Sequence, residues 1–355
     1  LYEADTIPPG EEILDDLKAV LQAYERQLTR QYGDVEPPET QVSERPSALS
    51  DELSHDLTPI RHYVAQRGYL FEPWQIAAYV AALKTKPFAI LAGVSGTGKS
   101  KLPQLMAEAT TAKCELIPVR PNWTDSSELL GYQDLRGTFR PGPMLRLARA
   151  AENDPETQHI CIIDEMNLAR VEYYLAEVLS RMEDRSRDEH GVCTSRPLLN
   201  LDLAGKDNRW AEQGLPPNLA IVGTVNMDET TQSFSRKVLD RAFTMEFSDI
   251  DLTAWHPIKE MQHSEPIHWP ASKWSPRAVQ ISELNDLTDG ERSDVDRVVQ
   301  TLDELNKFLV QGQLQVGYRT RDEAALFVLH ARQLAACFVT RQNESVYPLD
   351  LVLHM

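Results

Sequence analysis

Short apolar runs alternate with helical stretches between residues 87 and 250, a pattern typical of a parallel sheet covered on both faces. The runs predict five strands, over residues 88–92, 115–119, 160–163, 220–225 and 243–247. The sequence therefore predicts an α/β fold built on a five-stranded parallel sheet.

Helical spacing of apolar residues surrounds and interrupts these strands. Before the first strand it predicts helices over 11–31, from Thr58-Pro59 to Gly68, with Thr58 as N-cap, and from Pro73 onward. A helix between the third and fourth strands carries apolar residues on one face: Leu168, Val171, Leu175, Val178, Leu179 and Met182. After residue 250 the strands stop, and two helices follow, around 295–308 and 324–335.

One segment matches the phosphate-loop pattern G-x-x-x-x-G-K-[ST] in full. It follows the first strand, precedes a helical pattern, and consists of Gly93, Val94, Ser95, Gly96, Thr97, Gly98, Lys99 and Ser100. Backbone N–H groups of such a loop surround phosphates, and the next helix adds the positive end of its dipole. We expect Lys99 to reach the β- and γ-phosphates and Ser100 to coordinate Mg²⁺. The alternative is a glycine-rich turn with a solvated lysine.

Two adjacent carboxylates, Asp164 and Glu165, end the third strand. Carboxyl ends of strands line the ligand crevice of a doubly wound sheet. We expect Asp164 to hold Mg²⁺ through water and Glu165 to polarise the attacking water. The alternative is that both residues cap the next helix.

Three further polar residues are candidates for contacts to the γ-phosphate. Asn226 ends the fourth strand and could orient the water, although a strand-end asparagine is often a turn residue. Arg241 could enter a neighbouring subunit's site as an arginine finger, or be a helix C-terminal cation; Arg236 and Lys237 are weaker candidates. Arg319 opens a helix and could reach back to the γ-phosphate, or be a surface arginine.

These motifs divide the chain into three expected parts. Residues 1–49 form an acidic helix and a Pro/Glu/Ser-rich linker, and residues 50–250 form the nucleotide-binding core, with a hairpin insertion at about 186–218. Residues 251–355 form an all-α lid domain that we expect to be truncated. Because the chain starts at Leu1 and stops within an apolar stretch, we expect a fragment of a longer protein.

The composition of the chain limits the kinds of partner that it can bind. The net charge is −18, so the chain is a poor general binder of DNA phosphate. Contact with DNA would need a local basic surface, a channel formed on assembly, or a domain outside this chain. No apolar run approaches the roughly 18 residues of a membrane span, and the four dispersed cysteines indicate reduced thiols. We expect a cytoplasmic protein without a membrane partner.

Over roughly residues 58–355 the sequence resembles the AAA+ superfamily, and more narrowly the McrB-type subunit of methylation-dependent McrBC restriction systems. The resemblance rests on these segments: 86–100, Asp164-Glu165-Met166-Asn167, Glu177-Val178-Leu179 with Met182-Glu183, 222–228 and Leu239-Asp240-Arg241-Ala242-Phe243. Two features depart from the family pattern. In the family an acidic residue follows the asparagine by three positions; here that position is Glu229, and Asp228 stands one position earlier. The family's arginine triplet is reduced to Arg241.

The resemblance implies a hexameric ring with nucleotide and Mg²⁺ between subunits and the arginine finger acting in trans. It also implies a McrC-like nuclease subunit that stimulates hydrolysis, and DNA recognition through a separate domain. McrB-type motors hydrolyse GTP and most AAA+ relatives ATP, so both remain open. Tyr69, Phe71 and Gln75 precede the first strand and are candidates for the base pocket.

Three functions fit these observations. The first is a ring-forming NTPase motor of a restriction and phage-defence complex. The second is a MoxR-like remodelling chaperone that acts on a protein client. The third is a nucleotide-gated binding module with little hydrolysis, against which the intact Lys99, Asp164 and Glu165 argue.

Overall fold

The computed structural model describes residues 48–187, 192–199, 203, 207–227, 233–248 and 264–354, with side chains from residue 57 onward. The helix expected over 11–31 and nearly all of the linker lie outside this range. The chain divides into two compact units, one of residues 1–46 with 301–316 and one of residues 47–300 with 317–355. The core and lid boundary expected near residue 250 stays a prediction.

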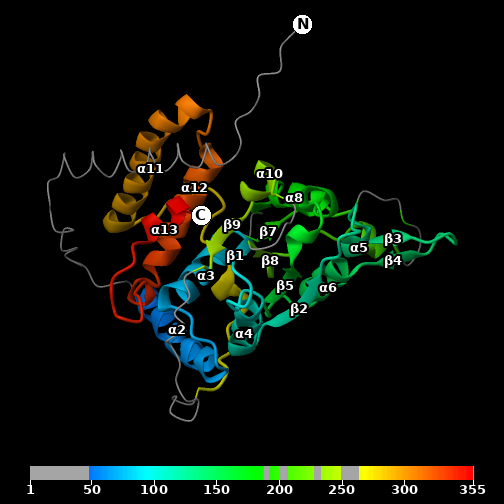
Figure 1. The fold of residues 1–355 in the computed structure, drawn as a ribbon, viewed down its shortest axis with the longest axis horizontal. Helices are drawn as coiled ribbons and strands as arrows, with labels where there is room; N and C mark the ends of the chain where they lie inside the picture. Colours follow the sequence, from blue (N-terminus) through cyan, green and yellow to red (C-terminus); the bar gives the residue numbers. More distant parts are fainter. Residues whose placement is uncertain are drawn as a thin grey trace, which may run out of the picture. The chain divides into compact units, whose positions relative to one another are not determined.

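Five parallel strands form the central sheet of the larger unit (Figure 1). In the order in which they pair they are β2 (Lys113–Pro118), β5 (His159–Asp164), β8 (Leu219–Asn226), β1 (Phe88–Gly93) and β9 (Phe243–Glu246). Every neighbouring pair is parallel. The predicted five-stranded parallel sheet is confirmed.

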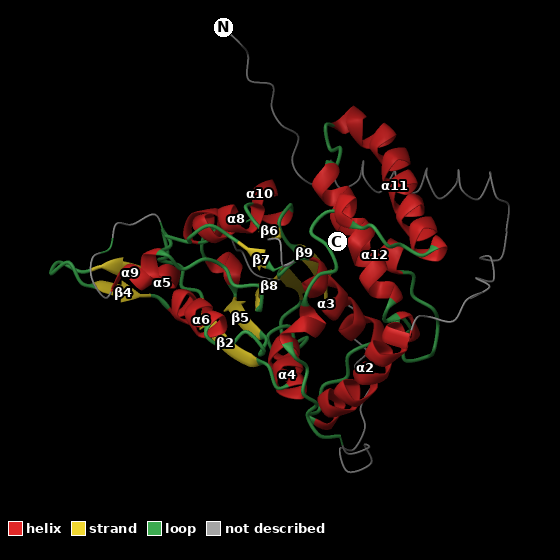
Figure 2. Cartoon of the chain, turned by 180° about the vertical axis from the view of Figure 1, so that it is seen from behind, coloured by secondary structure: helices red, strands yellow, loops and turns green. Residues whose placement is uncertain are grey.

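Side chains alternate between the two faces of the sheet, and each face has its own apolar core. Ala89 and Leu91 of β1 lie in one core, while Phe88 and Ile90 lie in the other. The first core is covered by α2 (Ala48–Gln66), α3 (Pro73–Thr85), α4 (Lys101–Thr110) and α12 (Tyr318–Arg332). The second is covered by α6 (Pro143–Glu152), α7 (Val171–Tyr174) and α8 (Ala176–Glu183). Figure 2 shows α3 and α4 apart from α6 and α8, with the strands between them.

Shorter elements complete this unit. They are α5 (Ser127–Leu130), α9 (Asn208–Ala211), α10 (Arg236–Leu239) and α13 (Pro348–His354), and a hairpin of β3 (Gly131–Gln133) with β4 (Phe139–Pro141) that the sequence did not indicate. Within the segment expected as a hairpin insertion, β6 (Ser186–Arg187) pairs with β7 (Cys193–Thr194).

Two helix predictions were wrong. Thr58 is not an N-cap, because α2 begins at Ala48 and contains Pro59. A proline inside a helix costs one backbone hydrogen bond, and the burial of Leu57, Ile60 and Val64 along this helix offsets that cost. The single helix expected over 168–182 is a 3₁₀ turn (Met166–Leu168) followed by α7 and α8.

The smaller unit is described over residues 301–316. It contains the end of α11 (Asp289–Leu309) and a 3₁₀ turn at Val310–Gly312. The Asn306 side chain bonds both backbone groups of Val316, at 2.9 Å and 3.0 Å. Of the helices described in either unit, none has the length and apolarity that crossing a membrane requires.

A buried histidine joins α12 to α3 and makes stability depend on pH. The backbone N–H of Arg277 donates to His330 Nε2 at 3.2 Å, so Nδ1 carries the proton and faces Thr85 Oγ1 at 2.9 Å. Burial, with the positive charges of Lys84 and Arg277, holds the pKa of His330 well below its ordinary 6.5. The unfolded chain therefore binds this proton more readily, and the stabilisation present above about pH 6.5 is lost as the pH falls.

We expect the free energy of unfolding to fall by up to about 1.4 kcal/mol per pH unit from this one group below pH 6.5. Urea unfolding at several pH values would measure the slope for the wild type and for His330→Gln. The variant should show the flatter dependence. If the free energy of unfolding changed with pH equally in the two proteins, the assignment of this pH dependence to His330 would be contradicted.

Candidate functional site

The phosphate loop lies at the carboxyl end of β1, where the sequence predicted it. The Lys99 ammonium is buried under the loop and donates to the carbonyls of Gly93 at 2.9 Å and Val94 at 2.5 Å. Gly93 has φ +146° and Gly98 φ +87°. A Cβ on Gly93 would lie 2.5 Å from the Phe247 carbonyl oxygen, so this curvature of the loop requires glycine. The closely wound backbone with a lysine inside it has the form of a triphosphate cradle.

Three oxygen atoms meet at the carboxyl ends of β5 and β8. The Ser100 hydroxyl donates to Asp164 Oδ1 at 2.5 Å, and the Thr224 hydroxyl donates to the same oxygen at 2.7 Å. Hydroxyl and carboxylate oxygens are the ligands that Mg²⁺ prefers, together with phosphate and water. Ser100 and Asp164 therefore fit the predicted Mg²⁺ site beside the phosphate loop.

Glu165 is held next to this point in an uncommon backbone conformation. Its φ of +52° lies in the left-handed region, which costs a residue other than glycine about 1–3 kcal/mol and occurs most often at functional sites. The Glu165 N–H donates to Thr224 Oγ1 at 3.0 Å, and Asn226 Nδ2 donates to Glu165 Oε1 at 3.3 Å. Asn167 Nδ2 donates to the Asn226 carbonyl at 3.3 Å. The structure thus joins the predicted carboxylate to the predicted strand-end asparagine.

The three candidates for the base pocket separate into two groups. Tyr69 and Phe71 stack with ring centroids 6.3 Å apart, and a Cβ on Gly98 would meet both rings. These rings therefore border the phosphate loop. The Gln75 side chain accepts a hydrogen bond from the Glu72 N–H at 2.9 Å, which caps α3. Gln75 thus stabilises the start of α3.

The two predicted arginines lie together at the opposite end of the sheet. Arg241 precedes β9, and Arg319 lies in the first turn of α12. Arg319 Nη2 contacts Glu183 Oε1 at 2.7 Å, and Arg241 Nη2 contacts the same oxygen. Hydrogen bonds from Arg241 and Arg319 hold the pKa of Glu183 below its ordinary value. The structure places Arg319 beside Arg241 and not beside the phosphate loop of its own chain.

A cavity of about 420 Å³ opens beside this pair of arginines. Five cationic side chains and three carboxylates line it, namely Lys86, Arg185, Arg241, Arg319, Arg321, Glu183, Asp322 and Glu323. Lys86 and Pro87, which directly precede β1, also belong to the lining, so the cavity lies at the amino end of that strand. A locally cationic cavity is thus built into a chain of net charge −18.

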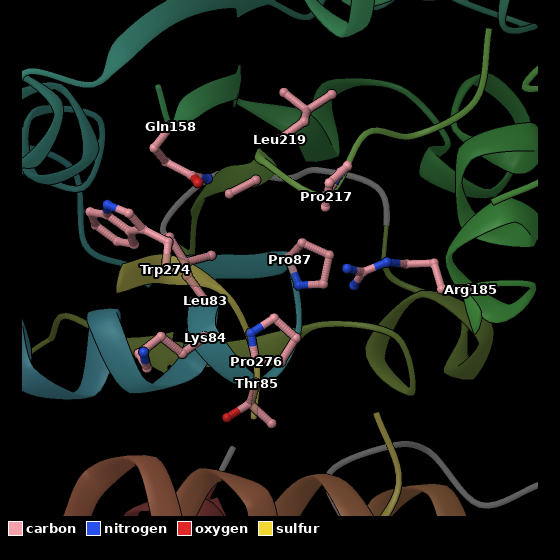
Figure 3. A pocket seen from close by; sticks show the side chains of 11 residues that line it. Leu83, Lys84, Thr85, Pro87, Gln158, Arg185, Pro217, Leu219, Trp274 and Pro276 are labelled. Carbon is pink, nitrogen blue, oxygen red and sulfur yellow. The ribbon is translucent and has the colours of Figure 1, made fainter. Parts of the chain in front are cut away.

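A second cavity lies nearby, between the ends of α3, β5 and β8 (Figure 3). Lys84, Gln158 and Trp274 are among the residues that line it. Its volume of about 10 Å³ is the size of one water molecule. It is too small for a nucleotide.

Two contributors to the site were not recognised from the sequence. Thr224 contacts both the Asp164 side chain and the Glu165 backbone N–H, and the sequence offered only its place in the family segment 222–228. Glu183 joins the two arginines, although the sequence offered only its place after Met182 in a family motif.

Comparisons with known proteins agree with this geometry. Residues 89–247 match the AAA domain (dynein-related subfamily), and residues 272–355 match a family described as a domain of unknown function. The type IV methyl-directed restriction enzyme EcoKMcrB subunit of Escherichia coli (strain K12) is 28% identical over 186 residues, which cover 50% of this chain. The match covers 38% of that relative, so the chain corresponds to only part of its length.

A crystal structure of a "putative ATPase" from Cytophaga hutchinsonii ATCC 33406 aligns with a TM-score of 0.46 and 14% identity, over 86% of this chain and 84% of that one. The assignment of this chain rests instead on the matched AAA domain, the McrB relative and the strand order β2-β5-β8-β1-β9. Residues 89–247 thus form an AAA domain, and the chain is similar to the McrB subunit over half of its length.

Proposed function

We propose that the chain hydrolyses ATP or GTP, with Mg²⁺, at sites formed between adjacent subunits of a ring, which by resemblance is a hexamer. The observation that carries this proposal is the placement of Asp164 and Glu165 against Ser100 and Asn226 at the end of the phosphate loop. That arrangement provides the two carboxylates that nucleotide hydrolysis uses, one for the metal and one for the water.

Each residue has a distinct part in this scheme. Lys99 and the loop N–H groups bind the phosphates, and Ser100 and Asp164 hold Mg²⁺, which neutralises charge on the phosphate oxygens when bound. Glu165 accepts a proton from the attacking water, and Asn226 fixes the Glu165 carboxylate while it does so. Tyr69 and Phe71 offer ring faces to the base beside Gly98.

The positions of Arg241 and Arg319 support an intersubunit site. Both arginines lie by the amino end of β1, whereas the phosphate loop follows its carboxyl end. Six residues of strand span about 20 Å, which is too far for either side chain to reach its own chain's γ-phosphate. A neighbouring subunit that brings its phosphate loop to the cationic cavity would receive both arginines, as an arginine finger in trans requires.

The McrB relative supports a role as the motor of a restriction or phage-defence complex, acting with a McrC-like nuclease and reaching DNA through partners or another domain. Co-purification of the chain with the product of a neighbouring nuclease gene would support this role. Recovery of a protein client without nuclease activity would instead favour a remodelling chaperone. A cytoplasmic location belongs to the same proposal.

Glu165→Gln tests the enzymatic part. Loss of a general base costs about 10²–10⁴-fold in rate, so we expect hydrolysis of ATP and GTP to fall by at least about 10²-fold while nucleotide binding is retained. Glu156→Gln, at an exposed carboxylate just before β5, is the matched control and should hydrolyse like the wild type. Equal rates for wild type and Glu165→Gln would refute the proposed chemistry. Competition between the two nucleotides in the same assay would identify the preferred base.

A further inference from the structure

Glu183 is the last residue of α8, on the face of the molecule where the two arginines meet. One of its oxygens, Oε1, contacts Nη2 of Arg319 at 2.7 Å and also Nη2 of Arg241. Among the described residues, Glu183 is the only carboxylate within ion-pair distance of either guanidinium. Three separate elements, α8, the turn before β9 and the start of α12, therefore converge on one oxygen atom.

The surroundings of Arg241 make its contact with Glu183 important for the position of the Arg241 side chain. Its side chain is only 14% exposed, and its Nη1 donates to the Lys237 carbonyl. Its Nε is buried and has no hydrogen-bond partner in the described part of the chain. Among the described residues, the carboxylate of Glu183 is thus the one ion-pair partner of this guanidinium. Without it, two guanidinium groups of like charge would face each other and separate.

We propose that Glu183 is a positioning residue that holds Arg241 and Arg319 at one point, so that both act on the same γ-phosphate of a neighbouring subunit. This inference rests on the proposed intersubunit site. Glu183 does not touch the nucleotide in this scheme. It sets the place where two cations converge, and the phosphate oxygens of the neighbour then replace or share the carboxylate as the partner of the guanidinium groups.

Glu183→Gln removes the charge and keeps the size of the side chain. Misplacement of a catalytic group by about 1 Å can cost about 10²-fold in rate, so we expect kcat to fall by about this factor. KM should stay close to that of the wild type, because the phosphate loop lies about 20 Å away along β1. The control is Asp184→Asn. Asp184 is the next residue, forms comparable ion pairs with Arg181 and Arg196 at 2.9 Å and 2.6 Å, and should be replaceable without loss of kcat.

A mixed assembly separates positioning from a general structural effect. Glu165→Gln chains have intact arginines but an inactive site, whereas Glu183→Gln chains have an intact site but displaced arginines. In a ring assembled from equal amounts of both, about one interface in four pairs an intact site with intact arginines. We therefore expect the mixture to recover about a quarter of the wild-type rate, well above either variant alone.

Two results would overturn the proposal. The first is a Glu183→Gln protein with the wild-type or a higher kcat while Glu165→Gln is inactive, which would leave the proposed function standing and remove the role of Glu183. The second is a mixture no more active than its components, which would show that Glu183 acts within its own chain's site or only on folding. A fully active Glu165→Gln protein would instead refute the proposed function itself.

Discussion

Replacement of Arg241 by alanine is expected to lower kcat for nucleotide hydrolysis by about 10³-fold or more, the range that trans-acting arginines contribute in phosphoryl transfer. In the proposed intersubunit site the guanidinium would neutralise charge that develops on the γ-phosphate in the transition state, so we expect its loss to affect the chemical step. Nucleotide affinity of the isolated subunit should be unchanged, because Arg241 lies at the amino end of β1 and the phosphate loop at the carboxyl end. Steady-state hydrolysis by the assembled protein and nucleotide titration of the isolated subunit measure the two effects.

Arg236→Ala is the matched control for this experiment. Arg236 begins α10 five residues before Arg241 and is exposed, and the sequence alone left it as a second candidate for the finger. It should keep the wild-type kcat. Loss of nucleotide affinity in Arg241→Ala, or equal loss of kcat in both variants, would contradict the assignment of the finger to Arg241.

The sequence was sufficient to predict the position of those parts of the candidate site whose residues are close together in the chain. A strand, a glycine-rich turn and a helix follow one another between Phe88 and Thr110, so the phosphate loop is a short-range pattern. Asp164, Glu165 and Asn226 could be placed near one another because each ends or directly follows a strand, and parallel strands bring their carboxyl ends to one edge of the sheet. The geometry around Glu165 could not be predicted, because the residue types indicate neither the left-handed backbone conformation of Glu165 nor its contact with Thr224.

Contacts between distant segments could not be predicted in this way. Arg319 was expected to reach the γ-phosphate of the nucleotide bound to its own chain, an expectation that depended on how α12 packs on the sheet. In the structure Lys86, at the end of α3, pairs with Glu323 of α12 at 2.5 Å, which fixes the start of α12 at the amino end of β1. The meeting of Arg319, Arg241 and Glu183 follows from that packing and spans 136 residues of sequence.

A second large effect is expected at Gly93, where the phosphate loop leaves β1. In Gly93→Ala the new Cβ would lie 2.5 Å from the Phe247 carbonyl oxygen and 2.7 Å from its carbon, separations that real side chains do not adopt. Phe247 is tied to this strand, because its N–H donates to the Ala92 carbonyl at 2.8 Å. Relief of the overlap therefore requires β9 to move away from β1. We expect a loss of at least about 3 kcal/mol in the free energy of unfolding, the size of other severe overpacking effects, together with loss of nucleotide binding.

Gly68→Ala distinguishes this steric effect from the cost of a positive φ alone. Gly68 has φ +83°, and a Cβ there would meet no atom within 4 Å. Its replacement should cost only the left-handed backbone penalty of about 1–2 kcal/mol and leave nucleotide binding intact, since the residue lies outside the phosphate loop. Urea unfolding and nucleotide titration of both variants would test the difference. Equal destabilisation of the two proteins would mean that β9 yields readily to a side chain at Gly93, and the loop geometry would then not depend on the β1–β9 contact.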